Sequence, residues 1–398
     1  MTPAELSRTV LRSVRGAVEE QELSVAVPAR IVVQPPPRPG CGDYASNVAL
    51  QLARQAGRPA REVAEILRKR LSGSAGIARV EIAGPGFLNF TLGDGAQVAL
   101  VREVLARGDG YGGGPAAAQS PVTADPATDS AADPAAHTAT DPATDSAADP
   151  AAHTATDPAT APAAGPVTAP AAHSTTAPAG DARAAVVAEV LARIDAAAGL
   201  GGRRQADEQP VLAPAPYDLA TLIARLGVDE ARWVLLRPAA QDPVRVPERP
   251  VQRESNPRFR VQYAYARARA LGRHARELGF EGEPGDVGAP VRGQAADDGS
   301  SDGAGSVALA LKSFHTLLAT YPSVVESAAR LRAPDRVVRH LEATADAFFR
   351  WHDVYPPLPV GEQKPLAVHR ARLALAEAGR TVLANGLRLL GISAPEHL

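Results

Sequence analysis

Apolar side chains recur at helical spacing near the N-terminus of this 398-residue chain. Residues 6–18 place an apolar side chain every three or four positions, the period of one helix face. Thr2 and Glu5 form a capping-box pattern around a proline, so a helix should begin at residue 3. The same periodicity predicts amphipathic helices over about residues 44–55 and 59–71.

Two other stretches of the N-terminal part follow the period of a β-strand. Residues 27–33 should form one strand, and residues 79–92 should form two strands separated by a Gly-Pro-Gly turn. In the last run, alternation puts Leu88, Phe90 and Leu92 on one face and Phe87, Asn89 and Thr91 on the other. We therefore expect residues 1–112 to form an α+β domain, with helices on a small antiparallel sheet.

The C-terminal part has helical periodicity almost throughout. An Asn-Pro pair at its start is a helix N-cap signal, and a glycine at residue 391 follows the last helical run. Because no strands alternate with these helices, residues 237–398 should form an all-α bundle. An acidic loop rich in Gly and Ser, about residues 281–306, should be disordered. The predicted helices cover residues 256–278, 307–320, 323–332, 335–354 and 365–390.

Between these two parts lies a repeat of low complexity. Residues 125–140 recur letter for letter at residues 141–156, and the repeat is rich in Ala, Pro and Thr. Such a composition cannot bury enough apolar surface to offset chain entropy. Residues 113–180 are therefore predicted to be a disordered linker, followed by a short helical region at residues 181–236.

The charge distribution is more informative than the net charge of −2. Residues 244–278 contain nine Arg against three acids, interleaved with aromatic residues. Arg and aromatic rings together suit phosphate contact and base stacking, although a solvated helix face would look the same. On the N-terminal strand, an outward Phe87 beside Asn89 could stack on and hydrogen-bond an extruded base, unless a neighbouring helix covers the ring.

Other chemistries find little support in the sequence. Cys41 is the single cysteine, which excludes disulfides and thiolate zinc sites, and the histidines of the repeat stand alone. We expect no metal, no cofactor and no catalytic triad. No apolar run reaches transmembrane length and no signal peptide is evident, so a cytoplasmic protein without a membrane partner is expected.

Three N-terminal motifs resemble the N-terminal additional domain of arginyl-tRNA synthetases. They read GDYASNVALQLARQ, PAREVAEILRKRL and VEIAGPGFLNFTL. In that family this domain holds the tRNA elbow, and its strand aromatic and Asn contact a D-loop nucleotide. The resemblance implies an elbow-binding site made of Phe87, Asn89, Asp43, Tyr44 and Asn47.

The C-terminal motifs NPRFRVQYAYARARAL and HRARLALAEAGRTVLANGLRLLGISAPEHL resemble the anticodon-binding domain of the same family. Arg260 stands where a tyrosine is usual, and His340-Leu341-Glu342 replaces a Tyr-x-Tyr pattern. A glutamate at this place would repel RNA phosphates or select for a base amino group. The resemblance implies that the anticodon loop meets Phe259, Arg260, Tyr263, Arg267, His340 and Leu398.

The catalytic signatures of the family are not recognisable. Its His-Ile-Gly-His motif aligns with residues 178–181, which read PAGD, and its lysine loop aligns with EQPVL at residues 208–212. The 37 positions from Asp181 to Tyr217 are too few for a doubly wound sheet. The resemblance therefore implies a paralogue without the catalytic domain, in which residues 181–236 are the remnant flanks of that domain, and adenylation is not expected.

Three functions follow as hypotheses. The first is a non-catalytic protein that binds tRNA or tRNA-like RNA by elbow and anticodon, with no DNA partner. The second is a regulatory or assembly factor that binds a protein such as a true synthetase. The third, disfavoured by the absent ATP signatures, is an arginine–tRNA ligase.

Overall fold

A computed structural model provides the coordinates of the protein. The structure describes residues 1–36, 41–93, 95–113, 181–200, 209–249, 253, 255–289 and 301–396, and for residues 301–307 it describes the backbone alone. Residues 114–180 of the expected disordered linker and residues 290–300 of the expected loop lie outside this part, whereas residues 301–306 of that loop are helical. Statements of absence below concern the described residues.

The first helix begins as its capping pattern predicts. α1 spans Pro3–Glu19, and its N-cap is Thr2. The Glu5 amide donates to the Thr2 hydroxyl at 3.3 Å, while the Thr2 amide donates to the Glu5 carboxylate at 2.8 Å. The capping box therefore satisfies two amides that the first helical turn would leave without partners.

A three-stranded antiparallel sheet forms the centre of the N-terminal domain. Its order is β1-β3-β2, with β1 at Tyr44–Ser46, β2 at Ile77–Ala83 and β3 at Phe87–Leu92. Helices α2 (Val48–Ala56) and α3 (Ala60–Leu71) complete the domain. This confirms the predicted α+β class.

Two local predictions for this domain are wrong. Residues 27–33 form no strand; an isolated bridge from Gln34 to Ala45 and a hydrogen bond from the Ser46 hydroxyl to the Val32 carbonyl at 2.9 Å join this region to the sheet. Residues 44–46 pair with β3 instead of opening a helix, so α2 begins at Val48. A strand of three residues is too short for its period to be distinguished from the following helix.

Helix α4 (Gly95–Arg107) and the short 3-10 helix η1 (Gly108–Gly110) follow the sheet in the chain but pack against the C-terminal helix α11 (Ala367–Leu390). The Asn385 side-chain amide donates to the carbonyls of Gly108 at 2.9 Å and Tyr111 at 3.0 Å. The chain that leads to residue 113 is thus fixed to the helical body.

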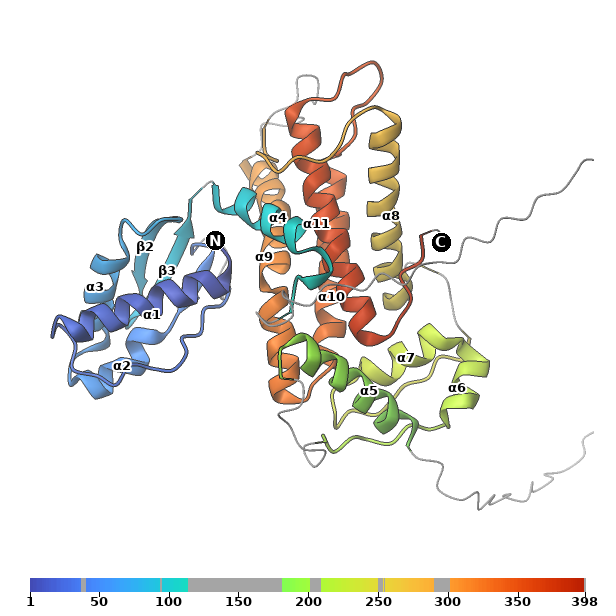
Figure 1. Ribbon diagram of the computed structural model, residues 1–398, viewed down its shortest axis with the longest axis horizontal. Coiled ribbons are helices and arrows are strands. Elements are labelled where there is room, and N and C mark those ends of the chain that lie inside the picture. Colours follow the sequence, from blue (N-terminus) through green and yellow to red (C-terminus); the bar gives the residue numbers. More distant parts are fainter. Residues whose placement is uncertain are drawn as a thin grey trace, which may run out of the picture. The chain divides into compact units, whose positions relative to one another are not determined.

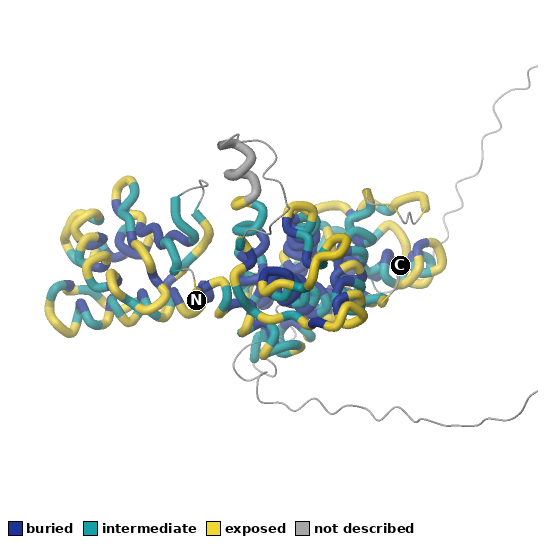
Figure 2. The backbone as a smooth tube through the Cα atoms, turned by 90° about the horizontal axis from the view of Figure 1, so that it is seen from above, coloured by how far each residue is buried: buried dark blue, intermediate teal, exposed yellow. Residues whose placement is uncertain are grey.

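The C-terminal body is an all-α bundle, as expected (Figure 1). Buried residues are concentrated inside it, between the helices (Figure 2). Asn256 caps the first of these helices by accepting from the amides of Arg258 and Phe259. The bundle consists of α8 (Pro257–Glu277), α9 (Ser301–Leu331), α10 (Asp335–Val354) and α11.

Three shorter helices adjoin this bundle: α5 (Ala182–Ala197) and α7 (Val228–Leu236) pack on it, and α6 (Leu219–Leu226) packs on α7. Arg183, 1% exposed, holds their connections in place. Its guanidinium donates to six backbone carbonyls, those of Ala213, Leu235, Pro238, Ala239, Ala240 and Asp242. Burial lowers the pKa of this guanidinium. The Arg183 guanidinium thus satisfies six carbonyls in the segments that join these helices, and it links those segments to one another.

Candidate nucleic-acid interface

Three aromatic rings stack along the junction of α8 and α10. The ring centroids of Phe259 and Tyr263 are 6.0 Å apart at an interplanar angle of 8°, and those of Tyr263 and Phe349 are 5.4 Å apart at 24°. All three side chains are half-buried. We call them the ring group. Partly exposed rings are platforms on which unpaired bases stack, largely without regard to sequence.

Two arginines flank the ring group. Arg260 lies over the Phe349 ring, with 5.0 Å from its guanidinium carbon to the ring centroid, and its Nε donates to Asp346 at 2.5 Å. Arg267 is exposed one helical turn beyond Tyr263. The structure thus brings together Phe259, Arg260 and Tyr263 of the predicted anticodon site and keeps Arg267 close by. Sequence analysis missed Phe349 and Asp346, although the aromatic run on the middle helix was a usable signal.

His340 does not join this group. Its side chain is 7% exposed, stacks on Tyr321 with 5.8 Å between ring centroids, and hydrogen-bonds the Leu317 carbonyl. Burial lowers the pKa of His340 to about 4, so the ring is neutral at pH 7. The predicted RNA contact by His340 is therefore corrected to a core contact between α10 and α9. The predicted contact by Leu398 lies outside the described residues.

On the sheet, Phe87 and Asn89 differ in exposure. Phe87 is 42% exposed, as expected for a stacking ring, whereas Asn89 is 8% exposed. Asn89 lies in a cleft of about 550 Å³ that is also lined by Arg61, Arg68 and Arg79. Glu65 and Glu81 line it too and pair with Arg68 and Arg79, each at 2.7 Å, so Arg61 is the arginine of this lining for which no ion pair with a described residue is found. The side-chain amide of Asn89 makes no hydrogen bond to any described residue. An amide with unused donors and acceptors among arginines suits a base beside a phosphate.

The other predicted elbow residues serve the protein itself. Asp43 accepts from the Leu92 amide at 2.8 Å and forms an ion pair with Lys312 at 3.0 Å. Tyr44 is buried, and burial raises the pKa of its hydroxyl. Asn47 is exposed and accepts from the Gln51 side chain at 3.0 Å. The structure therefore does not bring Asp43 and Tyr44 to a free surface.

The segment predicted to stand in place of the His-Ile-Gly-His motif ends at Asp181. Its carboxylate caps α5 by accepting from the Arg183 amide at 3.1 Å, and it accepts from the Ala215 amide at 3.2 Å. Residues 178–180 lie outside the described part. Among the described residues, no group of three His, Cys, Asp or Glu could hold a metal ion, and no helix is long and apolar enough to cross a bilayer.

A small α+β domain followed by a helical bundle with stacked rings is the arrangement of an aminoacyl-tRNA synthetase-like protein with an anticodon-binding domain. Residues 8–92 match the family described as the arginyl tRNA synthetase N terminal domain, and residues 261–398 match the DALR anticodon binding domain. The chain therefore carries these two domains in this order.

Relatives with known names agree with the domain matches. The chain is 40% identical over 183 residues to an arginine–tRNA ligase of Paenarthrobacter aurescens, and 40% identical over 189 residues to that of Pseudarthrobacter chlorophenolicus. Each match covers 46% of this chain but only 30% and 31% of the relative, so the chain spans about a third of their length.

Two further matches extend over whole chains. An arginine–tRNA ligase of Frankia alni is 28% identical over 566 residues, which covers 100% of both chains. Since this chain has 398 residues, at least 168 positions of that alignment hold no residue of it. The arginyl-tRNA synthetase of Thermus thermophilus matches with a TM-score of 0.58 at 13% identity and covers 100% of both chains, which shows a shared fold.

These matches overturn two predictions. The chain was expected to be a non-catalytic RNA binder or a protein-binding factor, and to be no enzyme, because the family's ATP signatures were not recognised. The end-to-end match to an arginine–tRNA ligase contradicts both expectations and points to the function that was disfavoured. Residue signatures alone were too narrow a basis for excluding the activity.

Proposed function

We propose that this chain acts in arginine–tRNA ligation and that its described residues hold the tRNA. The observation that carries the proposal is the alignment with the Frankia alni arginine–tRNA ligase over both whole chains. The N-terminal and anticodon-binding domains stand in the order given by their family matches. A cytoplasmic location, and the absence of DNA and membrane partners, stay predictions.

Two separate surfaces have the chemistry for this task. The ring group offers stacking faces for unpaired bases, with Arg260 and Arg267 beside it. On the sheet, Phe87 offers a ring and the Asn89 cleft offers an amide among arginines. The anticodon loop and the D-loop both present unpaired bases, so these surfaces fit the anticodon end and the elbow of an L-shaped tRNA.

The experiment is arginylation by the purified full chain. Labelled arginine, ATP and total tRNA are incubated with the protein, and acid-precipitable arginine is counted. Ligation predicts label on tRNA that depends on both arginine and ATP. A known arginine–tRNA ligase is the positive control. No label from this chain, where that control charges the same tRNA, would contradict the proposal.

A further inference from the structure

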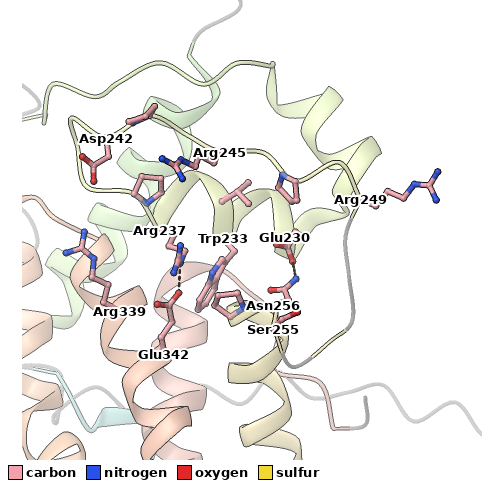
Figure 3. Close-up of a pocket in the computed structure, with 15 residues that line it drawn as sticks. Glu230, Trp233, Arg237, Asp242, Arg245, Arg249, Ser255, Asn256, Arg339 and Glu342 are labelled. Atoms are coloured by element: carbon pink, nitrogen blue, oxygen red, sulfur yellow. Dashed lines mark hydrogen bonds and ion pairs between the residues drawn. The ribbon is translucent and has the colours of Figure 1, made fainter.

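A second polar cleft opens where α7, the segment after it, and the beginnings of α8 and α10 meet. It has a volume of about 810 Å³. Figure 3 shows Arg237 and Glu342 facing each other on its floor, Arg245 above them, and Arg249 pointing outward at one end. Trp233 from α7 and Arg339 from α10 also line it. We call this site the arginine cleft.

The acids of the arginine cleft leave part of its positive charge unbalanced. Arg237 is paired with Glu342 at 2.6 Å. Glu230, the most buried acid, is paired with the buried Arg258 at 2.5 Å and accepts from the Asn256 amide at 2.8 Å. Arg339 is paired with Asp335 at 3.1 Å, and Asp242 adds one further carboxylate to the lining. Arg245 and Arg249 are exposed and have no ion pair with any described residue, so the cationic groups of the lining outnumber the acidic ones. The cleft therefore has cationic groups to offer to a ligand.

Trp233 provides an observation that is independent of the charges: a buried hydrogen-bond donor without a partner. Trp233 is 1% exposed, and its indole Nε1–H has no hydrogen-bond partner among the described residues. A buried donor without an acceptor is uncommon in native structures and calls for an explanation. The guanidinium groups of the cleft are the donors that a ligand can reach, and they only donate, so a ligand that pairs with Arg245 and Arg249 is rich in acceptor oxygens.

The arginine cleft and the ring group lie on the same two helices. Asn256 and Glu342 border the cleft, and the rings of Tyr263 and Phe349 stack seven positions further along α8 and α10. Seven helical residues span about 10 Å. The Arg260–Asp346 pair bridges the two helices between these levels. An RNA strand with a base on the ring group would therefore bring a nearby phosphate to the cleft.

We propose that the arginine cleft binds a phosphodiester group of the RNA strand whose bases stack on the ring group. The inference rests on the proposed tRNA binding and adds a contact to the RNA backbone that does not depend on the base sequence. The paired N–H donors of a planar guanidinium group match two phosphate oxygens in geometry and in charge. Contacts of this kind fix the position of an RNA strand, whereas contacts to bases select among strands.

Glu342 sets the strength of this contact. In the free protein the Glu342 carboxylate is paired with Arg237. An incoming phosphate is repelled by this carboxylate and competes with it for Arg237. Glu342→Gln keeps the shape of the side chain and removes the charge. RNA affinity should then rise severalfold, mainly at low salt, because screening weakens charge interactions. A fall in affinity would overturn the proposal.

The central test is salt-dependent tRNA binding by the full chain. The variant R245Q/R249Q removes the two unpaired arginines, and R276Q/R330Q removes two exposed arginines elsewhere on the helical body. The cleft variant should bind about tenfold more weakly at moderate salt, with a plot of log affinity against log salt shallower by about one to two. The control variant should stay near wild type, and thermal unfolding should be unchanged in both.

Three results are decisive. Equal weakening of all bound tRNAs by R245Q/R249Q supports a backbone contact. Wild-type tRNA affinity and salt slope in that variant would overturn the proposal, and if inorganic phosphate still raised the melting temperature of wild type but not of the variant, the ligand would be a free anion. If wild-type protein bound no tRNA at all, the proposed function itself would fail, which is a different outcome.

Discussion

The charged and polar side chains that matter most inside this protein act on backbone carbonyls. Arg183 donates to six of them, and His340 binds the Leu317 carbonyl within α9. Neither role follows from the residue types in the sequence. Donors of this kind are matched to carbonyls more than twenty positions away, so only the fold identifies the pairs.

His340 makes stability depend on pH. Its pKa is about 4 in the folded protein, because burial disfavours the charged ring, against 6.5 when unfolded. The unfolded state therefore binds the proton more readily, and this contribution is intact above pH 6.5 and lost as the pH falls toward 4. Between pH 7 and pH 5, His340 should remove about 2 kcal/mol from the free energy of unfolding.

His340→Phe tests this contribution, because a phenyl ring of similar size cannot titrate. Urea unfolding at pH 7 and pH 5 should show a smaller loss of stability in the variant than in wild type. His315, whose pKa burial also lowers to about 4, remains in both proteins and serves as the shared background. An identical loss in both proteins would show that His340 does not set the pH dependence.

The sequence identified the surface aromatics better than their surroundings. Phe87 is exposed, as strand alternation predicted, and Phe259 and Tyr263, which the family resemblance implied, are half-buried and stacked on each other. Asn89 shares the outer face of its strand but lies deep in a cleft, since arginines from a neighbouring helix and strand rise around it. The alternation along a strand determines which face a side chain lies on, but it does not determine how far neighbouring side chains bury it.

At the scale of elements, α9 is the main departure from the sequence pattern. Two helices were predicted over residues 307–320 and 323–332, because proline usually ends a helix. The structure has one helix, with Pro322 inside it. A proline here has no N–H for the carbonyl of residue 318, and the Tyr111 hydroxyl donates to that carbonyl at 2.9 Å. Tyr111 thus replaces the hydrogen bond that Pro322 lacks.

This replacement predicts a coupling between two residues from distant parts of the chain. Tyr111→Phe should lower the free energy of unfolding by about 1–3 kcal/mol, since it leaves the Leu318 carbonyl buried without a partner. Pro322→Ala restores a backbone N–H for the same carbonyl. In that background the loss caused by Tyr111→Phe should shrink by about 1 kcal/mol or more.

A double-mutant cycle of chemical unfolding measures the coupling. It needs wild type, both single variants and the double variant. Equal losses from Tyr111→Phe in the two backgrounds would mean that the hydroxyl does not compensate for Pro322. The other long helices need no such device, and the sequence predicted α10 at its observed bounds and α11 to within two residues.

For the whole molecule, the sequence predicted the class and order of the two domains but not their function. Charge and aromatic patterns pointed to RNA, and the family matches agree. The docking of α4 and η1 on α11 was not foreseen, because helix α4 has no sequence signal for its partner. It places Gly113 on the helical body, which residues from Asp181 onward also build.

Both ends of residues 114–180 therefore adjoin one helical body. In the structure, the chain passes from β3 to α4 within a few residues. The sheet surface and the ring group are accordingly connected through α4.

The most direct test of the account is tRNA binding by four proteins: wild type, Phe87→Ala, Tyr263→Ala and the double variant. Each single variant should bind total tRNA about tenfold more weakly, since base stacking on one ring contributes about 1–3 kcal/mol. The double variant should lose both contributions, and Arg276→Gln should change little. Wild-type affinity in the double variant would contradict the claim that these two surfaces hold the tRNA.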